Sequence, residues 1–262
     1  MTRRKVQGRT ERRVQYGKIW LMFLGKTVRK IFPSLAEMLA TLRFRTYMED
    51  GLITRHTADF LKDEKFTAAY AKGKATGSWG KMNPRWRVYT ACWAAAHAAN
   101  LPGDFVECGV NRGGMALAIM EYVNFNSLDK KFFLLDTYCG FPQGSQPSAE
   151  NLGQYENSYE DILKTFAPYP NAVVIRGEVP GTLSQITSEQ ICFLSIDMNC
   201  AEPEVATLRE LWPRLVPGAT VLLDDYGGGP SHYRQQKALD ALAEQIGFQI
   251  LANPTGQGVI IK

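Results

Sequence analysis

Short apolar runs that do not alternate with polar residues recur along the chain after residue 100. They cover residues 105–108, 132–136, 172–176, 192–197 and 220–224. Such runs are typical of parallel strands that are buried on both faces. Between them, apolar residues recur at helical spacing near residues 114–122, 159–166, 204–215 and 235–246. This alternation predicts an α/β fold in which helices cover both faces of a parallel sheet.

The last two apolar runs are connected differently. Residues 248–251 and 258–261 are separated only by residues 252–257, and so short a connection predicts a hairpin, whose strands are antiparallel. Five parallel strands and this hairpin give a doubly wound, mostly parallel seven-stranded sheet. The reversed strand favours the methyltransferase version of this fold over the all-parallel version that binds dinucleotides.

The segment before the sheet has a helical pattern throughout. From Ser34 to Asn100 apolar residues recur at helical spacing, with a loop over residues 73–80, and this predicts an all-helical N-terminal extension. We therefore expect residues 1–100 to form a basic arm with a helical lid or oligomerisation region, and residues 101–262 to form the cofactor-binding domain. Aromatic and basic side chains such as Arg87 are candidates to cover an active site. For Trp86 and Trp93 a place in the core is the favoured interpretation.

Charge and cysteine usage narrow the setting. The net charge of +4 hides a basic N-terminus, because residues 1–30 hold ten Lys or Arg and one acid. The apolar run Ile19–Leu24 is too short to span a bilayer. We expect a solvated or partner-packed arm, with weak contact to a membrane surface as the alternative, no nucleic-acid partner, and a homo-oligomer. Five cysteines without a C-x-x-C pair favour a reducing, cytoplasmic location, and no structural zinc site is expected from three scattered histidines.

A glycine-bearing turn follows the first predicted strand of the sheet. Residues 107–114 read E-x-G-x-x-x-G-G, which departs from the G-x-G-x-x-G pattern of dinucleotide sites. Glycines at Gly109 and Gly113 permit a sharp turn and close approach of a ligand. Glu107, at the mouth of the turn, and Asn111, within it, are further candidate cofactor contacts.

Acidic residues stand at the ends of four predicted strands. Because ligands bind at the carboxyl ends of parallel strands, these acids are expected on one rim of the sheet. Asp136, followed by Thr137, is placed to accept hydrogen bonds from the ribose of a nucleoside, although acids also end strands simply by facing water. Asp197, Asp224 and Asp225 offer hard oxygen ligands of the kind that Mg²⁺ prefers. The alternative is that Asp224 or Asp225 caps the following helix or turn.

The same segments resemble the macrocin O-methyltransferase family. The resemblance is carried, in order, by Glu107–Gly114, Leu135–Pro142, Asp197, and Pro217–Gly218 leading to Leu223–Gly227. It implies a class I methyltransferase that uses S-adenosylmethionine and a divalent cation to methylate a sugar hydroxyl. Matched residue by residue, Asp197, Asp224 and Asp225 would be the cation ligands, and Glu107, Gly109 and Asp136 cofactor contacts. Many members carry a second acid two positions after the first metal aspartate, where this chain has Asn199.

Methyl transfer to an alcohol needs help in removing the hydroxyl proton. A cation held by Asp197 and its neighbours would lower the pKa of a bound hydroxyl, and a general base would accept the proton. We expect His232, in the loop after Asp225, to be that base; the alternative is an exposed loop histidine. The turn Thr255–Gly258 could close over the acceptor, or be only a tight turn.

Two other functions are weighed against this one. A nicotinamide-dependent oxidoreductase would require the G-x-G-x-x-G turn and an all-parallel sheet. A catalytically idle binding or scaffold subunit is compatible with Asn199 but not favoured by the intact acids at the strand ends. Neither the acceptor nor the hydroxyl methylated is identified by the sequence.

Overall fold

The computed structural model describes residues 33–147 and 155–262, and these form two compact units that divide between Ala58 and Asp59. We call them the N-terminal unit and the main unit. The basic arm of residues 1–30 and the apolar run Ile19–Leu24 lie outside the described residues, as does the membrane contact expected of them. In the part of the chain that is described, no helix has the length and apolar character needed to cross a membrane.

The N-terminal unit is not all-helical, so the sequence expectation was wrong there. Helix α2 (Pro33–Phe44) is followed by a hairpin of β1 (Tyr47–Glu49) and β2 (Leu52–Thr54). The two residues between the strands, Asp50 and Gly51, have φ angles of 52° and 74°. An Asp-Gly pair is a strong signal for such a two-residue turn, because both positions need positive φ.

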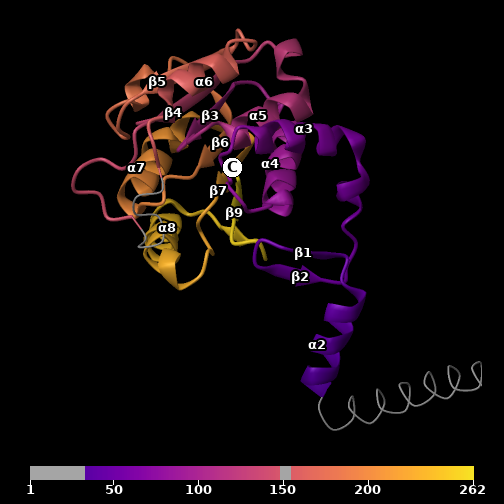
Figure 1. The fold of residues 1–262 in the computed structure, drawn as a ribbon. Coiled ribbons are helices and arrows are strands. Elements are labelled where there is room, and N and C mark those ends of the chain that lie inside the picture. Colours follow the sequence, from indigo (N-terminus) through magenta and orange to yellow (C-terminus); the bar gives the residue numbers. More distant parts are fainter. Residues whose placement is uncertain (1–32, 148–154) are drawn as a thin grey trace, which may run out of the picture. The chain divides into compact units, whose positions relative to one another are not determined.

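The main unit contains a seven-stranded sheet with the order β5-β4-β3-β6-β7-β9-β8 (Figure 1). Its strands are β3 (Asp104–Cys108), β4 (Phe132–Asp136), β5 (Ala172–Arg176), β6 (Ile191–Ile196), β7 (Leu215–Leu223), β8 (Leu251–Ala252) and β9 (Gly258–Ile261). The first five are parallel, and β9 is antiparallel to β7 and β8. The predicted fold class is confirmed. The strand expected over 248–251 is reduced to β8, because Phe248 stacks on Trp212 with ring centroids 4.3 Å apart.

Helices cover both faces of this sheet. They are α3 (Glu64–Ala75), α4 (Arg85–Ala98), α5 (Gly114–Val123), α6 (Tyr159–Phe166), α7 (Ala201–Leu211) and α8 (Tyr233–Ile246). Helix α4 lies against β6 and β7, whereas α7 lies on the other face of β6. Helix α8 packs against α7 (Figure 1). Short 3₁₀ turns cover Asp59–Lys62, Phe125–Ser127, Leu183–Gln185, Trp212–Arg214 and Pro230–His232.

Helices α3 and α4 belong to the main unit because they pack on α5. The contact is close: a Cβ atom at Gly73 would lie 2.5 Å from the Gly114 carbonyl oxygen. Trp86 packs edge-on against Phe60, but Trp93 is 52% exposed, so its expected place in the core was wrong. The division of roles expected between residues 1–100 and 101–262 stays a prediction.

Candidate active site

The carboxyl ends of the central strands lie side by side. The Gly109 N–H donates to the Leu135 carbonyl, that of Asp197 to the Cys108 carbonyl, and that of Asp224 to the Ile196 carbonyl, each over 2.9–3.0 Å. These bonds continue the parallel ladders one residue past the strands. The polar residues predicted at the strand ends are therefore brought to one edge of the sheet, as expected from the topology.

The two turn glycines serve contacts within the protein. Gly109 has φ +93°, and a Cβ there would lie 1.8 Å from the Asp197 carbonyl oxygen. Gly113 has φ +78°, and its Cβ would lie 2.6 Å from the ring of Phe166. Gly109 also lines the neighbouring cavity, whereas Gly113 is not among the residues that line it. Close packing thus accounts for both glycines, against backbone at Gly109 and against a side chain at Gly113, and the cofactor contacts expected of them stay predictions.

Asp136 holds the same turn. Its Oδ2 accepts hydrogen bonds from the N–H groups of Val110 and Asn111 (2.7 and 2.8 Å), and its Oδ1 accepts from the N–H of Tyr138 (2.7 Å) and the hydroxyl of Thr137 (3.3 Å). A carboxylate that accepts from this many donors fixes the backbone around it. The predicted bond to a ribose would be added to these contacts, and stays a prediction.

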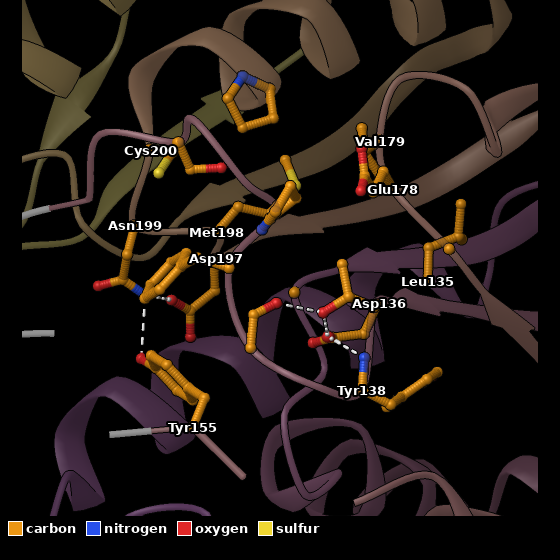
Figure 2. A pocket seen from close by; sticks show the side chains of 18 of the residues that line it. Leu135, Asp136, Tyr138, Tyr155, Glu178, Val179, Asp197, Met198, Asn199 and Cys200 are labelled. Carbon is orange, nitrogen blue, oxygen red and sulfur yellow. Dashed lines mark hydrogen bonds between the residues drawn. The ribbon is translucent and has the colours of Figure 1, made fainter. Parts of the chain in front are cut away.

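A cavity of about 590 Å³ opens at this edge (Figure 2), in the size range of small-molecule sites. Asp136 and Tyr138 lie at its floor, with Glu178 and Val179 on one side and Asn199 and Cys200 on the other. Of the predicted cofactor contacts, the cavity is lined by Gly109, Asn111, Asp136 and Thr137. The carboxyl ends of β3, β4, β5 and β6 all contribute to its wall.

Glu107 is not among the residues that line the cavity. It is 2% exposed, and burial, reinforced by the carboxylates of Asp224 and Asp136, raises its pKa well above the ordinary value. Its Oε2 has no hydrogen-bond partner among the described residues. The cofactor contact expected of Glu107 stays a prediction.

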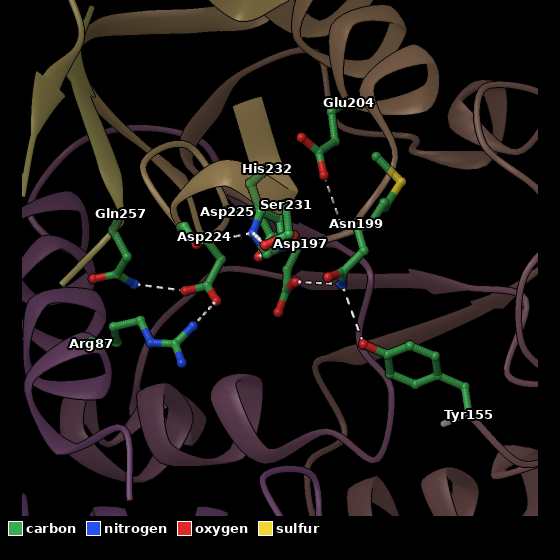
Figure 3. A network of polar contacts seen from close by, with 12 residues as sticks. Arg87, Tyr155, Asp197, Asn199, Glu204, Asp224, Asp225, Ser231, His232 and Gln257 are labelled. Atoms are coloured by element: carbon green, nitrogen blue, oxygen red, sulfur yellow. Dashed lines mark hydrogen bonds and ion pairs between the residues drawn. The ribbon is translucent and has the colours of Figure 1, made fainter. Parts of the chain in front are cut away.

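Asp197, Asp224 and Asp225 form a cluster in which one carboxylate oxygen of each lies within 4.8 Å of the others (Figure 3). We call this the acid cluster. Burial, together with repulsion by Asp224 and Asp225, raises the pKa of Asp197 well above its usual range. Burial and the charge of Asp224 raise the pKa of Asp225 to about 6. The mutual repulsion of these carboxylates, whose oxygens are hard ligands, is what a divalent cation would relieve.

The neighbouring side chains of Asn199, Tyr155 and Glu204 hold the acid cluster in place, and of these the sequence singled out only Asn199. Asn199 donates from Nδ2 to Asp197 Oδ1 (3.2 Å) and to the hydroxyl of Tyr155 (3.3 Å). Glu204, 2% exposed on α7, accepts from the Met198 N–H at 3.3 Å. The contacts depend on how α7 and the loop before it fold back, and no local motif indicates them.

His232 lies beside the acid cluster, as predicted. Its Nε2 is 3.4 Å from Asp225 Oδ1, and its Nδ1 is 3.1 Å from the Ser231 hydroxyl and 3.3 Å from the Gly228 carbonyl. The side chain is only 12% exposed. It is therefore not an exposed loop histidine. Its role as a base stays a prediction.

The loop between α3 and α4 makes hydrogen bonds to the turn between β3 and α5. Ser78 Oγ accepts a hydrogen bond from the Gly114 N–H at the start of α5 (2.8 Å), and the Ser78 carbonyl accepts from Asn111 Nδ2 (3.3 Å). Gly113, the residue before α5, has no side chain that could cap the helix. Ser78 therefore supplies the cap from 36 residues away in the chain.

Ser78→Ala is expected to weaken binding of S-adenosylhomocysteine by about twofold to tenfold, because loss of a capping hydrogen bond costs about 1 kcal/mol and loosens the turn that lines the cavity. Isothermal titration calorimetry measures the effect. Ser188→Ala is the matched control, since that hydroxyl donates to the Gln190 carbonyl in an exposed loop. Equal affinities for the two variants would show that the cap does not order the cavity.

Comparison with known proteins identifies the family of the chain. The family model described as macrocin-O-methyltransferase (TylF) matches residues 18–247. The chain is 25% identical over 151 residues to mycinamicin III 3''-O-methyltransferase of Micromonospora griseorubida, which covers 52% of this chain and 59% of the relative. It is 26% identical over 149 residues to 8-demethyl-8-(2,3-dimethoxy-alpha-L-rhamnosyl)-tetracenomycin-C 4'-O-methyltransferase of Streptomyces olivaceus, covering 52% and 57%. The chain thus spans less than two thirds of the length of these relatives.

Solved structures show the same fold. The O-methyltransferase NovP superposes with a TM-score of 0.57 at 22% identity, over 67% of this chain and 79% of that one. The calicheamicin methyltransferase CalS11 gives a TM-score of 0.53 at 18% identity, over 67% and 78%. The family match extends over most of the chain, from before the described residues to the end of α8. The chain belongs to the macrocin-O-methyltransferase family.

Proposed function

We propose that the chain is an S-adenosylmethionine-dependent O-methyltransferase that acts on a hydroxyl of a sugar or a glycosylated natural product, assisted by Mg²⁺. One observation carries the proposal: Asp197 lines the cavity and is also a member of the acid cluster. A methyl donor in the cavity and a hydroxyl held at the acid cluster would meet at this residue. The name of the Streptomyces olivaceus relative describes methylation of a rhamnosyl-bearing tetracenomycin, which supports the acceptor class.

The cavity residues suit the donor. Gly109, Asn111, Asp136 and Thr137 surround the end of the sheet where a nucleoside binds in this fold. Asp136 has two carboxylate oxygens, which together offer about four acceptor positions, and four donors already use them. A ribose hydroxyl would therefore share an oxygen or displace the long bond from Thr137. Glu107, behind the wall, would act on the turn and through it on the donor.

The acid cluster fits a divalent cation by its donor chemistry. Three aspartates supply only oxygen, and the buried Oδ2 of Asp225 has no hydrogen-bond partner among the described residues. Asp197, Asp224 and Asp225 would hold the ion, which would lower the pKa of an acceptor hydroxyl. Asn199 donates to Asp197 and so orients it.

His232 would accept the proton that the hydroxyl loses. Its Nδ1 faces the Ser231 hydroxyl and the Gly228 carbonyl, so a proton on Nδ1 would leave Nε2 as the acceptor on the side of Asp225. In the free protein Nε2 has no hydrogen-bond partner that satisfies normal geometry among the described residues. The ring is thus oriented with one nitrogen available near the acid cluster.

His232→Ala is expected to lower turnover by about 10²-fold to 10⁴-fold, the range for loss of a general base. Binding of S-adenosylhomocysteine should stay within about twofold, since His232 is not among the cavity-lining residues. Turnover is measured with any acceptor that the wild type methylates, and His97→Ala is the control, because that ring bonds to Gly218 away from the acid cluster. Unchanged turnover in His232→Ala would remove the base assignment.

The test of the proposed function is calorimetry with S-adenosylmethionine and S-adenosylhomocysteine, each with and without Mg²⁺, followed by methyl transfer to a panel of deoxysugar-bearing natural products. Binding of either compound supports the donor. Failure of both to bind would overturn the whole proposal, whereas turnover unaffected by a chelator would overturn only the cation. Donor binding without turnover of any acceptor would favour the idle binding subunit that Asn199 leaves open.

The state of the cysteines bears on the cellular setting. All five cysteines are free thiols, and four of them are buried, which fits a reducing, cytoplasmic compartment. A homo-oligomer and the absence of a nucleic-acid partner stay predictions from the sequence.

A further inference from the structure

Arg87 reaches the acid cluster from the first turn of α4. Its Nη1 lies 2.8 Å from Asp224 Oδ2, and the two side chains are 18% and 10% exposed. Gln257, from the turn before β9, donates from Nε2 to Asp224 Oδ1, also over 2.8 Å. Figure 3 shows the two partners on one side of Asp224, with Asp197 and Asn199 on the other. Both oxygens of this carboxylate are thus held by neighbouring side chains.

The two partners differ in charge. The guanidinium of Arg87 is protonated at every physiological pH, whereas the amide of Gln257 is neutral. Arg87 therefore supplies a fixed positive charge to a cluster of three carboxylates. A nearly buried ion pair of this kind attracts strongly, and removing one partner leaves the other charge uncompensated. Before a metal ion binds, the guanidinium of Arg87 supplies positive charge to the acid cluster, as a bound metal ion would.

We propose that Arg87 is a built-in counter-ion of the acid cluster, which stabilises the cluster before a cation binds and weakens the cation's binding once it arrives. The inference rests on the cation site of the proposed function. Gln257 orients the other oxygen of Asp224 without adding charge. The cation then binds reversibly to a preformed cluster instead of being held permanently, and Arg87 is a positioning residue that acts through Asp224.

The test removes the charge of Arg87 and the hydrogen bond of Gln257 in separate variants. Arg87→Met keeps an unbranched apolar side chain at this position but removes the charge. We expect this variant to bind Mg²⁺ about tenfold tighter or more. A divalent and a monovalent cation a few ångströms apart repel each other, and even in a medium like water the repulsion energy corresponds to about a tenfold change in the binding constant. Arg87→Lys keeps the charge and is expected to bind Mg²⁺ within about threefold of the wild type. Gln257→Leu removes the neutral donor and is not expected to tighten binding.

The measurements are calorimetric titration with Mg²⁺ alone, without acceptor, and thermal unfolding in chelator and in excess Mg²⁺. Arg87→Met should unfold at a lower temperature than the wild type in chelator and gain more from Mg²⁺, because stabilisation by a ligand increases with the logarithm of its affinity. This readout does not depend on activity. If Arg87→Met is too unstable to titrate, Arg87→Gln is used in the same way.

The outcomes separate this inference from the proposed function. If the wild type binds Mg²⁺ and Arg87→Met binds it equally or more weakly, the counter-ion inference fails and the proposed function stands. If Gln257→Leu tightens binding as much as Arg87→Met, charge is not the cause and the inference again fails. If S-adenosylhomocysteine binds but neither wild type nor Arg87→Met binds Mg²⁺, the cation of the proposed function fails as well. Tighter binding in Arg87→Met alone supports the inference.

Discussion

Gly109→Ala is expected to lower the midpoint of thermal unfolding by about 10 °C or more and to abolish binding of S-adenosylhomocysteine, because two penalties combine at this position. A Cβ atom would lie 1.8 Å from the Asp197 carbonyl oxygen, which is backbone and cannot rotate away. Alanine also resists a φ of +93°, at a cost of about 1–2 kcal/mol. Relief requires the ends of β3 and β6 to separate, and both line the cavity.

Gly247→Ala is the matched control for this substitution. Gly247 has a similar φ of +89°, but nothing lies within 4 Å of its Cβ position. It ends α8, and its N–H bonds to the Ala243 carbonyl. We expect this variant to lose only about 1 kcal/mol and to bind S-adenosylhomocysteine like the wild type. Similar losses in the two variants would mean that backbone conformation, and not the contact with Asp197, makes glycine necessary at position 109. Differential scanning fluorimetry and calorimetry measure both properties.

The sheet was predictable because each central strand is a continuous apolar run in the sequence. The run 132–136 became β4 and the helical pattern at 159–166 became α6 without a change of boundary. Elements that depend on a turn or on packing were predicted less well. The Asp50-Gly51 pair that builds the β1–β2 hairpin lies inside a helical pattern, and β8 is shortened by the stacking of Phe248 on Trp212.

The candidate site was predictable to the extent that it follows from topology. Parallel strands bring their carboxyl ends to one edge, so Asp197, Asp224 and Asp225 had to lie near one another. The partners of these acids come from elsewhere: Arg87 is 137 residues from Asp224, and Glu204 reaches back from α7. Nothing in the local sequence tells which arginine pairs with which acid, since that depends on how α4 packs on the sheet.

Gly113 is a position where the sequence motif was seen but its structural cause was not predictable. A glycine in a turn of this kind suggests close approach of a ligand, but here the space is taken by the ring of Phe166. The sequence indicates that a side chain must be absent, and the fold alone tells which group fills the space. Glu107 is a similar case, because its carboxyl is buried and is not among the groups that line the cavity, a position that the motif does not reveal.

Asp225→Asn is expected to become progressively more stable than the wild type as the pH rises from 4 to 7 in the presence of chelator. Burial and the charge of Asp224 raise the pKa of Asp225 from 3.8 to about 6, so the native state holds this proton more tightly than the unfolded chain. The stability that this group contributes is therefore fully present below pH 3.8 and is lost as the pH rises through 6. Asparagine cannot ionise and escapes this loss.

The change in the difference between the two proteins should be on the order of 3 kcal/mol across this range, since each pKa unit corresponds to about 1.4 kcal/mol. Removing the charge of Asp225 also relieves Asp197 and Glu204, whose pKa values burial and neighbouring acids raise, and this acts in the same direction. Urea unfolding at pH 4, 5, 6 and 7 gives the free energies, and Asp240→Asn, near the surface at the hydroxyl of Tyr226, is the control. A difference that stays constant with pH would show that Asp225 is ionised throughout and that the acid cluster is already compensated without a metal.

Excess Mg²⁺ should reverse the order of stability at pH 7, because the wild type regains a partner for its carboxylates and the variant has lost a ligand.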